Sequence, residues 1–141
     1  MSKGNTFEND LLKLIFNATA IADLAQDDGS SPATTLTVAL HTGDPGEAGD
    51  QTTSEISYTG YARIAVARTT GGWTVTGASV SPVADITFGQ MTAGAGGTVT
   101  HASVGSGVAN KLLYSGTVTP NIVVANGVTP KITTGSTITE D

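Results

Sequence analysis

The sequence predicts a mainly β protein, an antiparallel β-sandwich or open barrel of about seven strands with one N-terminal amphipathic helix. Two observations favour this class. From Thr34 onward, short runs rich in Val, Thr, Ile and Tyr alternate with Gly, Pro, Asn and Ser, a pattern typical of antiparallel strands. No helical segment separates these runs, which argues against the parallel sheet of a doubly wound fold.

The N-terminal segment carries the helical pattern. Asn5 is expected to be its N-cap, with Glu8 three residues later as an approximate capping box. Apolar residues recur at spacings of four and three, so they lie along one stripe of a helix. They are Phe7, Leu11, Leu14, Ala18, Ile21 and Ala25. Turn formers are expected to end the helix at Asp27, Asp28, Gly29 and Pro32. This stripe either caps the protein's own sheet or docks on a neighbouring protein.

The chain is therefore divided into residues 1–33, a helix and linker for docking or capping, and residues 34–141, the β-sandwich domain. The predicted strands span residues 35–41, 60–68, 72–77, 84–88, 97–104, 111–118 and 128–133. Gly71 and Gly72 predict a tight two-residue hairpin turn, because glycine accepts positive φ. In the strand before it, alternation directs Ile64 and Val66 towards the core.

Composition limits the possible functions. A chain of 141 residues is about the size of one domain, and its charged fraction of 13% is below the usual value of about a quarter. The net charge is -6 and the six basic residues are scattered, which argues against a nucleic-acid partner. The absence of Cys excludes disulfides, thiolate metal sites and cysteine nucleophiles. The apolar N-terminal stretch contains Lys13, Asn17 and Asp23, so neither a signal peptide nor a membrane span is expected.

One acidic stretch invites a catalytic or metal hypothesis. Side chains that could bind a metal ion through oxygen or imidazole nitrogen begin at the end of the predicted strand 35–41. They are His41, Asp44, Glu47, Asp50 and Glu55. Their spacing is not that of a calcium loop, and the intervening glycines and Pro45 favour a solvated connecting loop. No Gly-x-Ser-x-Gly elbow or Walker motif is present, and only one internal acid lies beyond this stretch. We therefore expect neither enzyme activity nor a cofactor.

Tyr58 and Tyr61 flank Gly60, where the acidic stretch rejoins the predicted sheet. Their phenol hydroxyls can stay in water while the rings lie against a partner, whereas Trp73 is expected to anchor the core. With the helix stripe, they complete the candidate interface, which consists of Phe7, Leu11, Leu14, Ile15, Tyr58 and Tyr61.

Several segments resemble known proteins when they are taken in order. The matching runs are "LHTGDPGEAG", "YTGYARIAVAR", "GGW", "ANKLLYSGTVT", "VANGVTPKI" and "TITED". In this order they resemble small structural proteins of tailed-bacteriophage virions, commonly labelled tail-fibre-like. The resemblance covers most of residues 36–141 and leaves out the N-terminal helix. It implies a non-enzymatic virion component, assembled in the cytoplasm of the bacterial host, and it supplies no catalytic residues.

Three functions then compete. The preferred hypothesis is a capsid decoration or cement protein, because a compact acidic domain suits a repeating shell on which many weak contacts add up. The alternative is a tail-associated or fibre-like module that contacts a host surface receptor. The third is a cell-wall or polysaccharide hydrolase. The expected partners are phage capsid or tail proteins and further copies of this chain, with no nucleic acid and no membrane.

Overall fold

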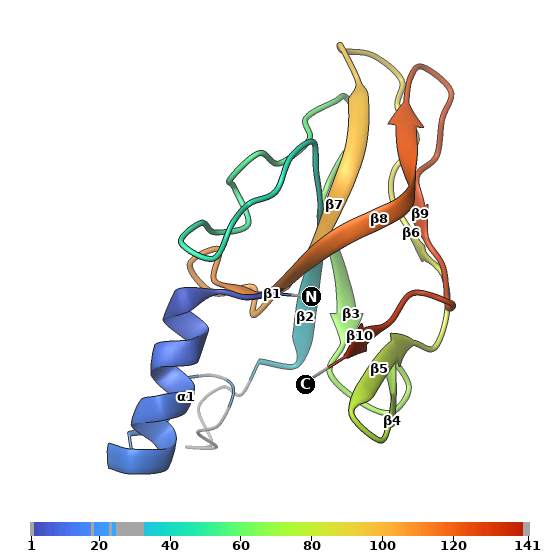
Figure 1. Ribbon diagram of the computed structural model, residues 1–141. Helices are drawn as coiled ribbons and strands as arrows, with labels where there is room; N and C mark the ends of the chain where they lie inside the picture. Colours follow the sequence, from blue (N-terminus) through green and yellow to red (C-terminus); the bar gives the residue numbers. More distant parts are fainter. Residues whose placement is uncertain (1, 18, 23, 25–32, 140–141) are drawn as a thin grey trace.

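The computed structural model describes residues 2–17, 19–22, 24 and 33–139 (Figure 1). It confirms a mainly antiparallel β fold with one N-terminal helix. The helix is α1 (Asn5–Asn17). The strands are β1 (Ser2–Lys3), β2 (Thr35–His41), β3 (Ile64–Ala67), β4 (Trp73–Thr76), β5 (Ser79–Pro82), β6 (Ile86–Thr87), β7 (Gly97–Gly105), β8 (Leu112–Val124), β9 (Lys131–Ile132) and β10 (Ile138–Thr139). None of the helical stretches within those residues is long and apolar enough to cross a membrane.

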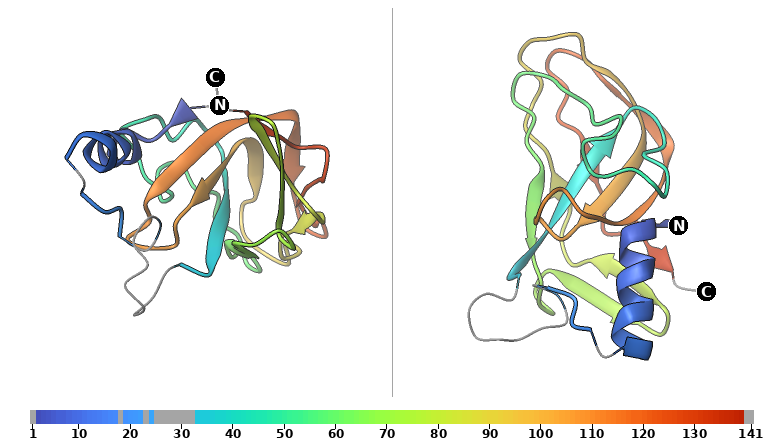
Figure 2. Two further views of the ribbon diagram at one scale, coloured as in Figure 1. Left: turned by 90° about the horizontal axis from the view of Figure 1, so that it is seen from below. Right: turned by 90° about the vertical axis from the view of Figure 1, so that its left-hand side faces the viewer.

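The strands form three antiparallel sheets. The largest has the order β1-β8-β7-β2-β3, and the smaller ones have the orders β10-β5-β4 and β6-β9. Figures 1 and 2 show α1 on one side of the five-stranded sheet and the β6 and β9 strands on the other. In the centre of the large sheet, β2 pairs with β7 so that His41 lies opposite His101 and Thr37 lies opposite Gly105. This register decides which side chains share a face.

The main core lies on one face of β2 and β7. Val38 and Leu40 of β2 pack there with Val99 and Val104 of β7, and all four are buried. The other residues buried in this core come from the segments that cover it and from the end of β8: Ile56, Tyr58, Ile86, Phe88, Met91 and Val124. Side chains alternate along a strand. Residues 37, 39 and 41 therefore lie on the opposite face, where the loop after β2 covers them.

The alternation predicted for residues 64–67 is confirmed. Ile64 and Val66 are half-buried against the main core, and Ala65 and Ala67 are exposed. Other strand ends differ from the prediction: β8 continues to Val124, and the two-residue strands β1 and β10 and the strand β5 were not predicted. Strands this short leave almost no periodic signal in a sequence.

The helix packs on the protein's own sheet. Phe7 is buried, and its ring meets that of Tyr114 edge to face with centroids 5.7 Å apart. Ile21 and Leu113 join them in a second core, and Leu11 packs partly buried beside it. The described residues at the start of the chain are thus tied to the β domain, both by this core and by the pairing of β1 with β8.

Both ends of the helix differ from the expectation. The first helical hydrogen bond runs from the N–H of Glu8 to the carbonyl of Gly4, so Gly4 and not Asn5 takes the N-cap position. The helix ends at Asn17, and Ile21 reaches the second core from a non-helical segment, because packing overrides the helical spacing there. Ala18, Ala25, Asp27, Asp28, Gly29 and Pro32 lie outside the described residues.

The predicted hairpin at Gly71 and Gly72 is wrong. β3 pairs with β2, and β4 pairs with β5, so these glycines join two different sheets. A Cβ on Gly72 would come within 2.1 Å of the Ala67 carbonyl oxygen, so glycine is needed there for close approach and not for a positive φ. The tight turn lies one strand later, where Gly77, with φ of 60°, precedes Ala78 between paired β4 and β5.

Candidate functional site

The acidic stretch after β2 is a loop that folds back onto the strand it leaves. The N–H of Thr42 donates to the carbonyl of Ser54 at 2.9 Å, and the N–H of Ile56 donates to the carbonyl of Leu40 at 2.9 Å. These bonds close residues 42–55 into a lobe, which we call the 42–55 loop. The loop covers the face of β2 that carries Thr37 and His41. It therefore gives this strand a second buried face.

His41 is fully buried in this face. Its Nδ1 lies 2.8 Å from the carbonyl oxygen of Thr53, and its Nε2 lies 2.7 Å from Oγ of Ser103. A carbonyl only accepts, so Nδ1 carries the proton and donates to Thr53. In the neutral ring, Nε2 then accepts a hydrogen bond from the Ser103 hydroxyl. Both imidazole nitrogens are satisfied when the ring is uncharged.

Gln51 completes the network from the loop. Its side chain is fully buried; Nε2 donates to the carbonyl of Thr37 at 3.0 Å and to Oγ of Ser103 at 3.3 Å. The Thr37 hydroxyl donates to Oε1 of Gln51 at 2.7 Å. A Cβ at position 105 would come within 2.2 Å of this Oε1, so Gly105 supplies the space that the amide occupies. Gln51 thus fixes the loop to β2 and β7.

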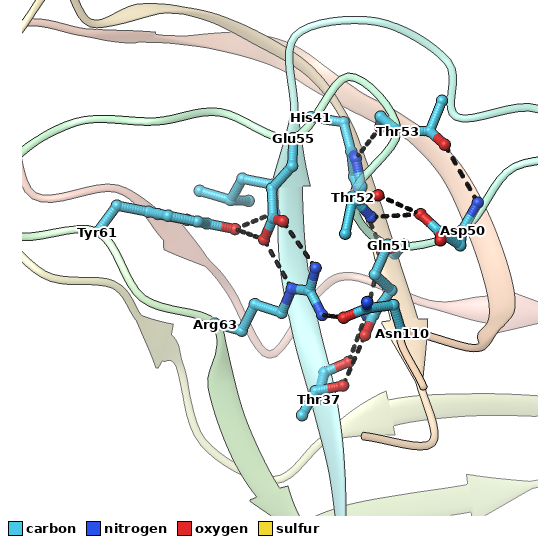
Figure 3. Close-up of polar contacts among 12 residues, drawn as sticks. Thr37, His41, Asp50, Gln51, Thr52, Thr53, Glu55, Tyr61, Arg63 and Asn110 are labelled. Atoms are coloured by element: carbon cyan, nitrogen blue, oxygen red, sulfur yellow. Dashed lines mark hydrogen bonds and ion pairs between the residues drawn. The ribbon is translucent and has the colours of Figure 1, made fainter. Parts of the chain in front are cut away.

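A second set of polar contacts lies at the edge of the loop (Figure 3). Arg63 donates from Nε and NH2 to the two carboxylate oxygens of Glu55, both at 2.7 Å, and from NH1 to Oδ1 of Asn110 at 2.7 Å. Tyr61 donates its hydroxyl to Glu55 at 2.9 Å and accepts from the N–H of Leu40 at 3.1 Å. Burial, reinforced by the Glu55 carboxylate, raises the pKa of the Tyr61 phenol well above its usual range. These bonds join the loop, β2 and the segment before β3.

Of the remaining acids of the loop, Asp44 and Asp50 make turns and Glu47 contacts β1. Asp44 accepts from the N–H of Gly46 at 2.9 Å, and Glu47 accepts from the Ser2 hydroxyl at 2.9 Å. Hydrogen bonds from the hydroxyl and N–H of Thr52 lower the pKa of Asp50. Within the described ranges there is no group of three His, Asp or Glu side chains that could hold a metal ion. The loop acids each have a structural partner within the protein instead.

Ser103 and His41 have the contact expected of a nucleophile and its base, but their surroundings do not suit catalysis. Ser103 is 2% exposed and His41 is 0% exposed, so a substrate carbonyl has no path to the serine oxygen. That oxygen also accepts a hydrogen bond from Gln51. The imidazole lacks the carboxylate that orients it in a Ser-His-Asp triad. The arrangement holds the loop in place.

The six candidate interface residues have different surroundings. Phe7 is buried and Leu11 half-buried against the protein's own sheet, and the side chains of Leu14 and Ile15 lie outside the described ones. Tyr58 is buried, and its hydroxyl donates to the carbonyl of Gly89 at 2.9 Å.

The two tyrosines therefore differ from the expectation that their hydroxyls stay in water. The ring centroids of Tyr58 and Tyr61 lie 5.3 Å apart, and Tyr61 stacks on Phe88 at 6.0 Å. Their rings gain more by joining this aromatic cluster than by lying at the surface, since burial removes a large apolar area from water.

The sequence did not single out Gln51, Ser103, Thr37 or Asn110. Each is a polar residue of a common type, with no motif around it. The one available signal is indirect: the run of small and acidic residues after β2 contains a single glutamine. The register of β2 and β7 is what brings these side chains together.

Acid should weaken this network. Burial lowers the pKa of His41 below its ordinary value of about 6.5. The unfolded chain then binds more protons than the folded one once the pH falls below about 6.5, so the free energy of unfolding should fall from there towards the folded-state pKa. Urea unfolding at a series of pH values measures this. A His41→Gln variant should lose this pH dependence of stability between neutral pH and the range where carboxylates titrate. A His101→Gln variant, the control, should keep it. Equal curves of stability against pH for both variants would contradict the assignment to His41.

Comparison with known proteins places the chain among phage proteins. No curated protein matches it. A family model described as "Podophage GP4 fiber I protein gp80" matches residues 2–140, which is almost the whole chain and includes the N-terminal helix. The resemblance to tailed-phage virion proteins is confirmed. The chain therefore belongs to the podophage GP4 fiber I protein gp80 family and is a structural protein of a tailed-phage virion.

Proposed function

We propose that the protein is a non-enzymatic subunit of a virion fibre. The observation that carries this proposal is the family match over residues 2–140, whose description names a fibre protein. It favours the fibre-like module over capsid decoration, the hypothesis that composition and size favour. The geometry agrees with a passive role, because the reactive pair Ser103 and His41 is buried and committed to internal hydrogen bonds.

The rigid loop supports the same role. A fibre subunit must keep its shape under load, and the 42–55 loop is held by buried hydrogen bonds from Gln51 and by the double contact between Arg63 and Glu55. Bidentate hydrogen bonds between charged groups, such as this one, belong to the stronger class of hydrogen bond. We infer that the loop reinforces the five-stranded sheet and does not act as a flexible connection.

Attachment to other virion proteins is proposed to involve α1. Phe7 faces the protein's own sheet, whereas Phe16 near the end of the helix is 77% exposed. Contact of this side chain with another protein would remove its apolar area from water. We propose that this end of α1, with Leu14 and Ile15, meets a neighbouring virion protein or a further copy of the chain.

Particles labelled with gold-conjugated antibody against this protein test the proposal by electron microscopy. We expect gold on the fibres and none over the head surface, together with a low copy number per particle by quantitative mass spectrometry. The control is an antibody against the major capsid protein, which should label the head alone. Gold spread over the head, with hundreds of copies per particle, would contradict the fibre assignment and support capsid decoration.

A further inference from the structure

A cleft of about 380 Å³ lies between the five-stranded sheet and the small sheet formed by β10, β5 and β4. Its floor is apolar and includes the buried side chains of Val38, Ile86 and Val104. Trp73 and Ile138 line it from the small sheet. Figure 1 shows β10 and β5 below the middle of β8, the strand that forms the other side of the cleft. A volume of this size is within the range of small-molecule sites, which is about 300–1,000 Å³.

Hydroxyl groups surround the apolar floor. They belong to two threonines of β8 and three residues of the segment between β9 and β10: Thr117, Thr119, Thr133, Ser136 and Thr137. Among the described residues, no hydrogen bond is made by any of these five hydroxyls. No Asp, Glu, Lys, Arg or His is among the residues that line the cleft.

Trp73 adds a further unused donor. Its Nε1 is buried and has no acceptor among the described residues. A buried polar group without a partner is rare in folded proteins and calls for an explanation. This indole N–H is enclosed by protein, so the hydrogen-bonding groups that the cleft offers to a ligand are the five hydroxyls, four of them on exposed residues and one on half-buried Ser136.

This lining selects the chemistry of a ligand. A charged ligand would lose its hydration and find no counter-charge, which is costly. A purely apolar ligand would strip water from the hydroxyls and offer them no partner. A ligand with an apolar face and several uncharged hydroxyls satisfies both parts of the cleft. We propose that the cleft binds a neutral saccharide of one or two rings.

The chain contains a single tryptophan, and Trp73 lines both this cleft and a neighbouring hollow beside Arg68. The indole N–H signal is therefore read together with the amide signals of Thr117 and Thr137, which line the cleft alone. The experiment is a titration of the full ¹⁵N-labelled chain, followed by NMR, with D-glucose, D-galactose, L-rhamnose and N-acetyl-D-glucosamine. Concentrations up to about 50 mM cover dissociation constants in the millimolar range. We expect a saturable shift of the indole N–H signal and of cleft amides with at least one sugar, and an affinity at least about tenfold weaker for D-glucuronate, which carries a charge.

Matched variants separate binding from folding. Thr117→Val combined with Thr137→Val removes two hydroxyls and keeps the side-chain shape, so the affinity should fall about tenfold while the amide spectrum stays folded. Thr98→Val makes the same change at an exposed position of β7 outside the cleft, and its affinity should equal that of the unmodified chain.

Three outcomes would overturn the proposal. They are the absence of a saturable shift with every neutral sugar, an equal response to D-glucuronate, and an affinity that the double variant leaves unchanged. A shift with trialanine and with none of the sugars would assign the cleft to a polypeptide instead. Each of these results leaves the fibre assignment standing, since that assignment depends on where the protein lies in the particle.

Discussion

Replacing Phe88 with alanine is expected to lower the free energy of unfolding by about 3–5 kcal/mol, the usual cost of deleting a buried phenylalanine. Phe88 is 2% exposed in the main core, and its ring stacks on Tyr61 with an interplanar angle of 7°. Its N–H also donates to the carbonyl of Pro130 at 3.0 Å, which places the ring between the tyrosine segment and the C-terminal strands. Removal of the ring leaves a cavity that Tyr61, held by its own hydrogen bonds, cannot fill.

Equilibrium unfolding in urea measures this change. Phe16→Ala is the matched control, because it removes the same side chain from a position that is 77% exposed, and its effect should stay within about 0.5 kcal/mol. A loss of stability that is equal in the two variants would show that Phe88 is not the centre of the core.

Replacing Gln51 with leucine is expected to cost about 2–4 kcal/mol, since each buried polar group that loses its partner costs about 1–3 kcal/mol. Leucine has a similar size but leaves the Thr37 carbonyl and hydroxyl without the partners that the amide supplies. Ser103 also loses one of its hydrogen bonds. Faster hydrogen exchange should follow at the amide of Gly105, which lies under Gln51.

The same substitution at Gln90 is the control. Gln90 is exposed, and its side chain makes a single hydrogen bond, to the carbonyl of Gly127 at 2.9 Å. Gln90→Leu should therefore change stability by less than about 1 kcal/mol. If Gln51→Leu were as mild as Gln90→Leu, the loop would not depend on the buried network. A Thr37→Val variant combined with Gln51→Leu should cost less than the sum of the two single changes, because both remove the same contact.

The strands that the sequence located well are those with a strong local pattern. β2 begins and ends as predicted, and residues 64–67 alternate as predicted, because alternation depends on neighbouring residues alone. The hairpin was misplaced for the opposite reason. Two adjacent glycines are compatible with a tight turn and equally with a close approach between two backbone segments. Here the Ala67 carbonyl lies against Gly72, and this contact shows that close approach is the reason for the glycine.

The site was less accessible to prediction than the fold. The acidic residues of the 42–55 loop suggest a metal or catalytic site because carboxylates have recognisable chemistry, yet Asp44 and Asp50 make local turns. One residue that holds the loop is Gln51, whose partner Ser103 lies 52 positions away. Tyr58 and Tyr61 were placed at a surface, and the aromatic cluster with Phe88 was invisible before the chain folded.

By itself, the sequence determined the mainly β class, the N-terminal helix and the membership of a phage structural family, because these depend on composition, local periodicity and motif order. Only the tertiary structure decided which polar groups meet and which faces stay open. The register of β2 against β7 sets His41 beside Ser103, and a shift of one residue would turn every one of these side chains to the other face.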